Sequence, residues 1–295
     1  MTELNLERAG AGASEELQRD LLRFRTAYPP KTLMVDGCEW QYYAGGQGVQ
    51  VLAILPGGLR SGEAAFRLAL ALENDFRILA LTYPPLPRIA QWVEGLKAIL
   101  DAERIPSAHI FGSSAGGMLA QCFVRRYPRY VLKLVLGDTS LPDRERGLKY
   151  RRRSWLMPIL PVGLARRLGR RSLPRLVAEL PEDQRPFWLA YLSELLDQIY
   201  SRAWLVASSQ VGIDYMLNYT FSAGDLKDWQ GQMLIIDSDD DTVIGLQQLE
   251  RVRALYPQAQ RYTFHQAGHV PAITHEAEYI DLLRCFLKFG EVPHA

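Results

Sequence analysis

Between residues 31 and 137, short apolar runs alternate with segments in which apolar residues recur at helical spacing. Four runs are continuous and rich in Val, Ile and Leu, as expected for strands covered on both faces of a parallel sheet: VQVLAILPGG, FRILALTYPP, HIFGSS and YVLKLVLGD. The two earlier runs, KTLMVDG and EWQYYA, are more typical of an antiparallel edge. Helical patterns cover 62–74, 88–102 and 115–127. The alternation predicts right-handed crossovers and an α/β fold with a mostly parallel, doubly wound sheet.

The alternation is interrupted between about residues 140 and 228, where the pattern is helical and broken by prolines. It resumes with QMLIID, a helix over 245–255, QRYTFH and a last helix over 275–289. An insertion between two parallel strands emerges at the carboxyl ends of the strands, where it can cover that edge. We therefore predict an α/β core of residues 31–140 and 229–295, with residues 141–228 as an inserted helical cap.

The segment SEELQRDLLRF indicates a short helix within an N-terminal extension of residues 1–30. Ser14 is a suitable N-cap, and acidic residues follow it in the first turn. We expect Leu17, Leu21 and Leu22 to form one apolar face. We expect this helix to serve only to pack against the α/β core.

The composition, the net charge and the cysteine spacing argue against several classes of protein. Of 295 residues, 48% are hydrophobic and 23% charged, which is ordinary for a globular protein, and the net charge of +1 gives no reason to expect a nucleic-acid partner. Cys38, Cys122 and Cys285 are widely spaced with no CxxC pair, so neither a disulfide framework nor a zinc site is expected. The start of the chain is too charged for a secretory signal, and no run is long enough to cross a bilayer. These features predict a cytoplasmic protein.

The stretch AHIFGSSAGGMLAQCF places two serines between an apolar run and a helical pattern. In the sequence Gly112-Ser113-Ser114-Ala115-Gly116, the glycines flank Ser114 and relieve the crowding of a sharp strand-to-helix turn. Such a turn exposes the hydroxyl above the sheet, so we predict Ser114 as a nucleophile. A serine hydroxyl also needs a base, a group that orients the base, and donors for an oxyanion.

The stretch FHQAGHVPAITHE supplies the base, His269, in a loop between the last predicted strand and the last helix. Gly268 permits a tight turn, and Pro271 keeps the loop from continuing as a strand. Because this loop leaves the carboxyl end of a strand, it lies at the same edge of the sheet as Ser114. The competing histidines are His109, His265, His275 and His294.

The orienting acid is expected in DSDDDTVI, directly after the strand QMLIID. Asp241 and Asp240 are the leading candidates, while Asp237 and Asp239 fit a solvated loop or a helix cap. Asp138 ends the run YVLKLVLGD and is a further alternative.

Two backbone N–H groups are needed for the oxyanion, one from the residue after the nucleophile and one from the loop after an early strand. Ala115 supplies the first. In AILPGGLRSGE, Gly57 and Gly58 allow the backbone to approach a substrate closely, so we select Gly58 as the second donor with Leu59 as the alternative. A plain turn is the competing interpretation of this loop.

Together, GSSAGG, DDDTVI and QAGHVP resemble the motifs of the α/β-hydrolase superfamily in the chain order serine, acid, histidine, and the resemblance covers residues 31–290. In that family the acid usually precedes a small residue and a Val-Val or Val-Ile pair, which favours Asp241 over Asp240. A serine at 114 argues against the branches whose nucleophile is an aspartate. Many members have His-Gly where this chain has Pro56-Gly57, so an interaction that braces the oxyanion loop is missing.

Within the superfamily, ILALTYPP, IFGSSAGGMLAQ, SWLMP and LYPQAQR resemble the maspardins. The maspardins are regarded as binding proteins with an incomplete triad. The chain departs from them by its histidine at 269, and this departure favours an active enzyme.

The predicted cap is strongly basic, since residues 144–175 contain eleven Lys and Arg against a single acid, Glu145. Such a surface can contact anionic lipid or steer an acidic ligand toward the site. The alternative is a solvated face whose arginines pair with nearby acids. Aromatic residues between 187 and 221 can line an apolar pocket or pack the cap on the sheet.

The sequence thus predicts a serine hydrolase that acts through an acyl-enzyme. Its expected substrate is a small molecule, an ester or thioester of an apolar acid. No metal or organic cofactor is expected. A carbon–carbon hydrolase or lyase using the same triad is one alternative, because a fold hosts many reactions. A maspardin-like, non-catalytic binding protein is the other.

Overall fold

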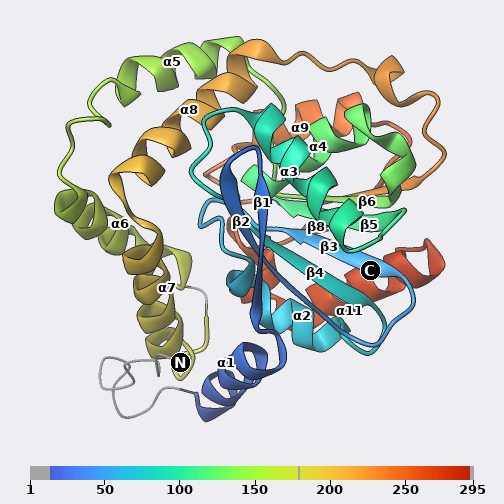
Figure 1. Cartoon of the computed structure of the whole chain (residues 1–295), viewed down its shortest axis with the longest axis horizontal. Coiled ribbons are helices and arrows are strands. Elements are labelled where there is room, and N and C mark those ends of the chain that lie inside the picture. The colour runs from blue at the N-terminus through green and yellow to red at the C-terminus, as the bar shows by residue number, and fades with distance from the viewer. Residues whose placement is uncertain (1–13, 179, 293–295) are drawn as a thin grey trace.

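A computed structural model describes residues 14–178 and 180–292 of the protein. An eight-stranded sheet forms its centre (Figure 1). The strand order is β1-β2-β4-β3-β5-β6-β7-β8. β1 and β2 form an antiparallel edge, and the other neighbours pair in parallel apart from β2 and β4. The strands are β1 (Pro30–Val35), β2 (Cys38–Gly45), β3 (Val51–Leu55), β4 (Arg77–Thr82), β5 (Ala108–Ser113), β6 (Val131–Gly137), β7 (Gln232–Ser238) and β8 (Gln260–Phe264). The predicted α/β-hydrolase fold is confirmed.

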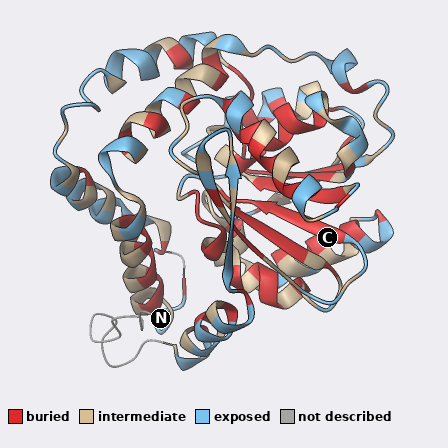
Figure 2. Cartoon of the chain, in the orientation of Figure 1, coloured by how far each residue is buried: buried red, intermediate tan, exposed pale blue. Residues whose placement is uncertain are grey.

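Alternate residues of the central strands enter two separate hydrophobic clusters, one on each face of the sheet. In β3, Leu52 and Ile54 join one cluster, and Val51, Ala53 and Leu55 join the other. The first cluster includes α1 (Glu15–Ala27), α2 (Phe66–Leu72) and α11 (Glu276–Phe289); the second includes α3 (Ile89–Ala102), α4 (Ala115–Arg126) and α9 (Leu246–Leu255). Figure 2 shows the resulting band of buried strands between helices that are buried on their inner sides. Burial on both faces explains why these strands are continuous apolar runs.

The N-terminal helix α1 begins after Ser14, whose side chain accepts a hydrogen bond from the Leu17 N–H at 3.5 Å. Leu17, Leu21 and Phe24 are its buried residues. Leu22, expected on this face, is 57% exposed, so that prediction was wrong. Successive residues of an α-helix are rotated by about 100° around the helix axis. Leu17, Leu21 and Phe24 are four and three residues apart and therefore share one face, whereas Leu22 points away from it.

Among the described residues, four α-helices lie between β6 and β7: α5 (Arg144–Ser154), α6 (Val162–Leu176), α7 (Arg185–Ile199) and α8 (Arg202–Asn218). α5 packs on α8, and α6 packs on α7, forming an arch beside the sheet in Figure 1. α7 joins the cluster of α2, where the Phe66 ring contacts three aromatic rings of α7. α8 joins the cluster of α3 through Val211 and Tyr215. The inserted helices are therefore anchored to the cores of both faces of the sheet.

Some basic residues of the inserted helices bind polar groups of the same segment. Arg166 donates to the Tyr200 carbonyl at 2.7 Å, and Arg170 pairs with Asp197. Trp155, between α5 and α6, is 70% exposed. Within the described ranges, no helix combines the length and apolar character needed to cross a bilayer. Contact of this surface with anionic lipid or an acidic ligand stays a prediction.

Candidate active site

Ser114 lies between the end of β5 and the first residue of α4, with φ of 52° and ψ of −115°. A positive φ is unfavourable for any residue with a Cβ and is retained where surrounding contacts enforce it. The Ser114 N–H donates to the Gly137 carbonyl at 2.8 Å, and the Thr139 hydroxyl donates to the Ser114 carbonyl at 2.8 Å. The end of β6 therefore holds the turn in place.

The two glycines that flank Ser114 allow the strand, the turn and the helix to approach one another. A Cβ on Gly112 would lie 2.4 Å from the Gly116 carbonyl oxygen, and a Cβ on Gly116 would lie 1.9 Å from the carbonyl oxygen of Leu55. Both distances are far below van der Waals contact, and the opposing atoms belong to the backbone. Any side chain at either position would separate α4 from the sheet, so these glycines are required by close packing.

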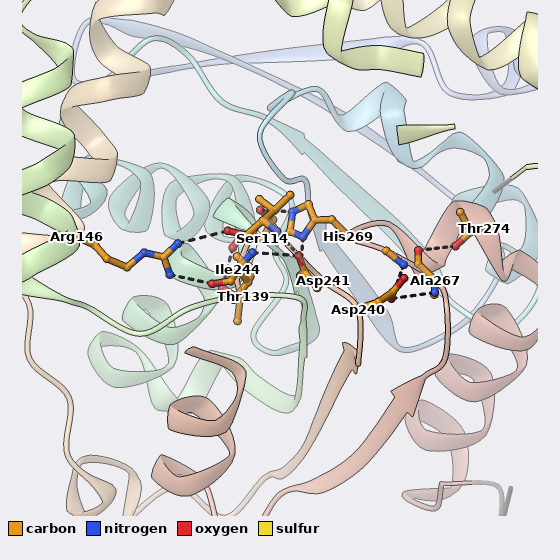
Figure 3. A network of polar contacts seen from close by, with 11 residues as sticks. Ser114, Thr139, Arg146, Asp240, Asp241, Ile244, Ala267, His269 and Thr274 are labelled. Atoms are coloured by element: carbon orange, nitrogen blue, oxygen red, sulfur yellow. Dashed lines mark hydrogen bonds and ion pairs between the residues drawn. The ribbon is translucent and has the colours of Figure 1, made fainter. Parts of the chain in front are cut away.

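His269 lies in the loop between β8 and α10 (Pro271–Thr274), directly after Gly268, whose φ is +64°. Its Nε2 lies 3.2 Å from the Oγ of Ser114, and its Nδ1 lies 2.8 Å from Oδ2 of Asp241 (Figure 3). The histidine side chain is largely buried. Its two ring nitrogens thus join the serine and the aspartate in one continuous chain of hydrogen bonds.

Asp241 follows β7, and its carboxylate is fully buried. Oδ1 accepts the N–H groups of Val243 at 2.8 Å and Ile244 at 3.0 Å, leaving Oδ2 for the imidazole. This pattern fixes the orientation of the carboxylate. Through it, the ring is held with Nδ1 toward the aspartate and Nε2 toward Ser114.

Asp240, the alternative acid, bonds to the loop that carries the histidine. Its Oδ1 accepts the N–H groups of Ala267 at 3.2 Å and Gly268 at 2.9 Å. Asp240 thus ties the histidine loop to the loop after β7, while the imidazole bonds to Asp241 (Figure 3).

The other histidines have different surroundings. His265 bonds to Asp239 at 2.6 Å on the surface, and His275 bonds to the Thr274 hydroxyl at 3.2 Å. His109 is buried against Gln50, and burial lowers the pKa of its imidazole to about 4. His294 lies outside the described residues.

The loop after β3 lies directly beside the serine. A Cβ on Gly57 would be 3.3 Å from the Cβ of Ser114, whereas one on Gly58 would meet open space. Leu59, the alternative donor, is partly buried against the core. Ala115 is the first residue of α4, where backbone N–H groups have no partner within the helix. Gly58 and Ala115 are thus placed on segments adjoining Ser114, and their role as oxyanion donors stays a prediction.

A model of the alpha/beta hydrolase family matches residues 52–282. The chain belongs to the alpha/beta hydrolase family. It is 26% identical to maspardin of Danio rerio over 271 residues, covering 86% of this chain and 81% of maspardin. It is 28% identical to 2-hydroxymuconate semialdehyde hydrolase of Pseudomonas putida over 217 residues, covering 70% and 71% of the two chains. A solved hydrolase from Pseudomonas aeruginosa superposes with a TM-score of 0.74 at 21% identity, covering 88% of this chain and 98% of the other. The expected similarity to the maspardins is confirmed.

In this alpha/beta hydrolase, one residue of the inserted helices also supports the acid loop. Arg146 of α5 donates to the carbonyls of Ile244 at 3.0 Å and Val243 at 3.4 Å (Figure 3). The N–H groups of the same two residues bind Asp241. From the sequence, Arg146 is only one of the basic residues in 144–175, because nothing in its local pattern points to a loop about a hundred residues away.

Asp138, the other alternative acid, directly follows β6 and has a buried side chain and φ of 40°. Burial raises the pKa of its carboxyl well above the ordinary value, and the negative charges of Asp241, Asp237 and Asp240 raise it further. Its Oδ1 has no hydrogen-bond partner among the described residues. A carboxyl whose protonated form is favoured in this way is poorly suited to supply the negative charge that stabilises an imidazolium.

Asp138→Asn is expected to raise the melting temperature at pH 8 and to raise it much less at pH 4.5. The protonated carboxyl is favoured in the folded state, whereas in the unfolded chain it ionises at a pKa of about 4. The contribution of Asp138 to the stability of the wild type therefore falls as pH rises above about 4. Asparagine cannot ionise, so the variant lacks this penalty. Thermal unfolding followed by circular dichroism at both pH values measures the difference. A gain of equal size at both pH values contradicts the raised pKa.

Proposed function

We propose that the protein is a serine hydrolase that cleaves a carboxylic ester or thioester through an acyl-enzyme. The observation that carries the proposal is the chain of hydrogen bonds from Ser114 through His269 to Asp241, at 3.2 Å and 2.8 Å. Both distances are those required for proton transfer from the serine hydroxyl and for orientation of the base.

The proposed reaction begins when Ser114 Oγ attacks the carbonyl carbon and His269 Nε2 takes its proton. The N–H groups of Ala115 and Gly58 bind the oxyanion. His269 then gives the proton to the leaving alcohol or thiol, and the acyl group stays on Ser114. A water molecule, deprotonated by the same imidazole, releases the acid and restores the serine. The carboxylate of Asp241 stabilises the imidazolium.

Two alternatives are supported by the relatives. The similarity to 2-hydroxymuconate semialdehyde hydrolase favours a carbon–carbon hydrolase built on the same three residues. The similarity to maspardin favours a protein that keeps the fold and binds a partner. A fold alone does not choose among them, whereas an imidazole within reach of Ser114 favours catalysis.

Purified protein is expected to hydrolyse p-nitrophenyl esters, and Ser114→Ala is expected to lose at least about 10³-fold in kcat, because removal of the nucleophile leaves only binding and the oxyanion donors. Release of nitrophenolate measures the rate across acetate, butyrate and octanoate esters. If the wild type hydrolyses none of them and Ser114→Ala behaves identically, the ester hydrolase proposal fails and the binding protein gains. Turnover of a vinylogous 1,5-diketone without ester hydrolysis supports the carbon–carbon alternative.

The two neighbouring aspartates form a matched pair of variants. Asp241→Asn is expected to lower kcat by about 10³ to 10⁴-fold, since the amide no longer balances the imidazolium or fixes its tautomer. Asp240→Asn keeps an oxygen that can accept the Ala267 and Gly268 N–H groups, so a loss of less than about 10-fold is expected. Steady-state kinetics on p-nitrophenyl butyrate compares them. The opposite ranking would move the acid to position 240.

A further inference from the structure

The loop that follows β3 ends in a buried arginine without a counter-ion. Arg60 is 4% exposed, and no carboxylate among the described residues pairs with its guanidinium. Burial lowers the pKa of Arg60 to about 10, which leaves it charged at neutral pH. Its Nη1 is buried and has no hydrogen-bond partner in the described part of the chain. An isolated buried cation is costly, so proteins normally pair it with an anion.

Two tryptophans contact this guanidinium. Its central carbon lies 4.6 Å from the ring centre of Trp92 in α3 and 5.4 Å from that of Trp204 in α8. Tyr83 stacks on Trp92 with ring centroids 4.4 Å apart. Contact with aromatic faces leaves the edge of a guanidinium available for hydrogen bonds, which is the geometry that binds a carboxylate with two parallel N–H groups.

The three aromatic side chains around Arg60 also carry unused polar atoms. Trp92 Nε1, Trp204 Nε1 and the hydroxyl of Tyr83 are buried without a hydrogen-bond partner among the described residues. Each such group normally finds a partner, because a buried donor without one has lost its hydrogen bonds to water and gained none in return. Guanidinium, indole and phenol groups are all hydrogen-bond donors, so the missing partner is an acceptor.

The backbone of Arg60 is bonded to the loop that lies beside the candidate nucleophile. The Arg60 N–H donates to the Gly57 carbonyl at 2.9 Å, and Gly57 packs against Ser114. Arg60 also has φ of 56°, an unfavourable backbone conformation for a residue with a side chain. Trp204 is only partly buried and comes from the inserted helices. Through Arg60, the loop beside the nucleophile contacts α3 and the inserted helix α8.

We infer that Arg60 and its aromatic neighbours bind a carboxylate of the substrate. This inference rests on the proposed function and specifies its substrate class as an ester or thioester that carries a free carboxylate at a distance from the scissile bond. The net charge of +10 in residues 144–175 would raise the local concentration of such an anion. A charge-assisted hydrogen bond contributes about 1.5 to 3 kcal/mol, which corresponds to about 10 to 100-fold in kcat/KM.

The test compares two esters of similar size, p-nitrophenyl hydrogen glutarate and p-nitrophenyl valerate. The wild type is expected to prefer the glutarate by at least about 10-fold in kcat/KM. Arg60→Met is expected to lose about 10 to 100-fold on the glutarate and less than about threefold on the valerate. Arg129→Met is the matched control, since Arg129 is exposed. Arg60→Lys replaces Arg60→Met if the Met variant fails to fold. It retains the charge but cannot donate two parallel hydrogen bonds, so an intermediate loss on the glutarate is expected.

A binding measurement separates this inference from the proposed chemistry. Glutarate is expected to raise the melting temperature of Ser114→Ala, glutaramide is not, and the rise is expected to vanish when Arg60→Met is added. If the wild type hydrolyses valerate and glutarate equally and glutarate stabilises neither protein, the subsite is disproved while the hydrolase stands. If no ester reacts but glutarate still binds through Arg60, the subsite stands and the hydrolase falls. Stabilisation by inorganic phosphate in place of glutarate overturns the carboxylate assignment.

Discussion

The close approach of α4 to β3 is the constraint on which the rest of the site depends. Gly116 lies so near the Leu55 carbonyl that no side chain can be accommodated there, and Gly112 is similarly restricted by Gly116. The chain can leave β5 and enter α4 at this distance only through a sharp turn, which places Ser114 at a positive φ. The same approach brings Gly57, which follows β3, into contact with Ser114. One packing requirement thus positions the serine, the first N–H groups of α4 and the loop after β3.

The remaining groups come from loops that are held by one another and by the inserted helices. Asp241 is fixed by two backbone N–H groups, and Arg146 of α5 holds the carbonyls of the same residues. Asp240 fastens the histidine loop to the acid loop. Trp204 of α8 contacts Arg60, which follows the loop beside Ser114. The inserted segment therefore contributes contacts to the acid loop and to the end of the loop after β3.

The sequence was sufficient for the features that local chemistry determines. The parallel strands were predicted because burial on both faces requires continuous apolar runs, and Ser114 and His269 were selected because each follows a strand with suitable neighbours. Asp241 was preferred to Asp240 only on the resemblance to the α/β-hydrolases. Features set by distant contacts could not be predicted. Nothing near Arg60 reveals that α3 and α8 enclose it with two tryptophans, and nothing near Arg146 reveals its bonds to the acid loop. Leu22 was misplaced because three leucines close in sequence do not share one stripe of a helix.

Covalent labelling with a serine-directed probe measures whether His269 activates Ser114. The protein is incubated with a fluorophosphonate, digested, and analysed by peptide mass spectrometry. The account predicts a phosphonyl adduct on Ser114 in the wild type and a labelling rate at least about 100-fold lower in His269→Ala, because general-base catalysis contributes about that much or more. An unlabelled Ser114 in the folded wild type, or an equal rate in His269→Ala, would contradict it.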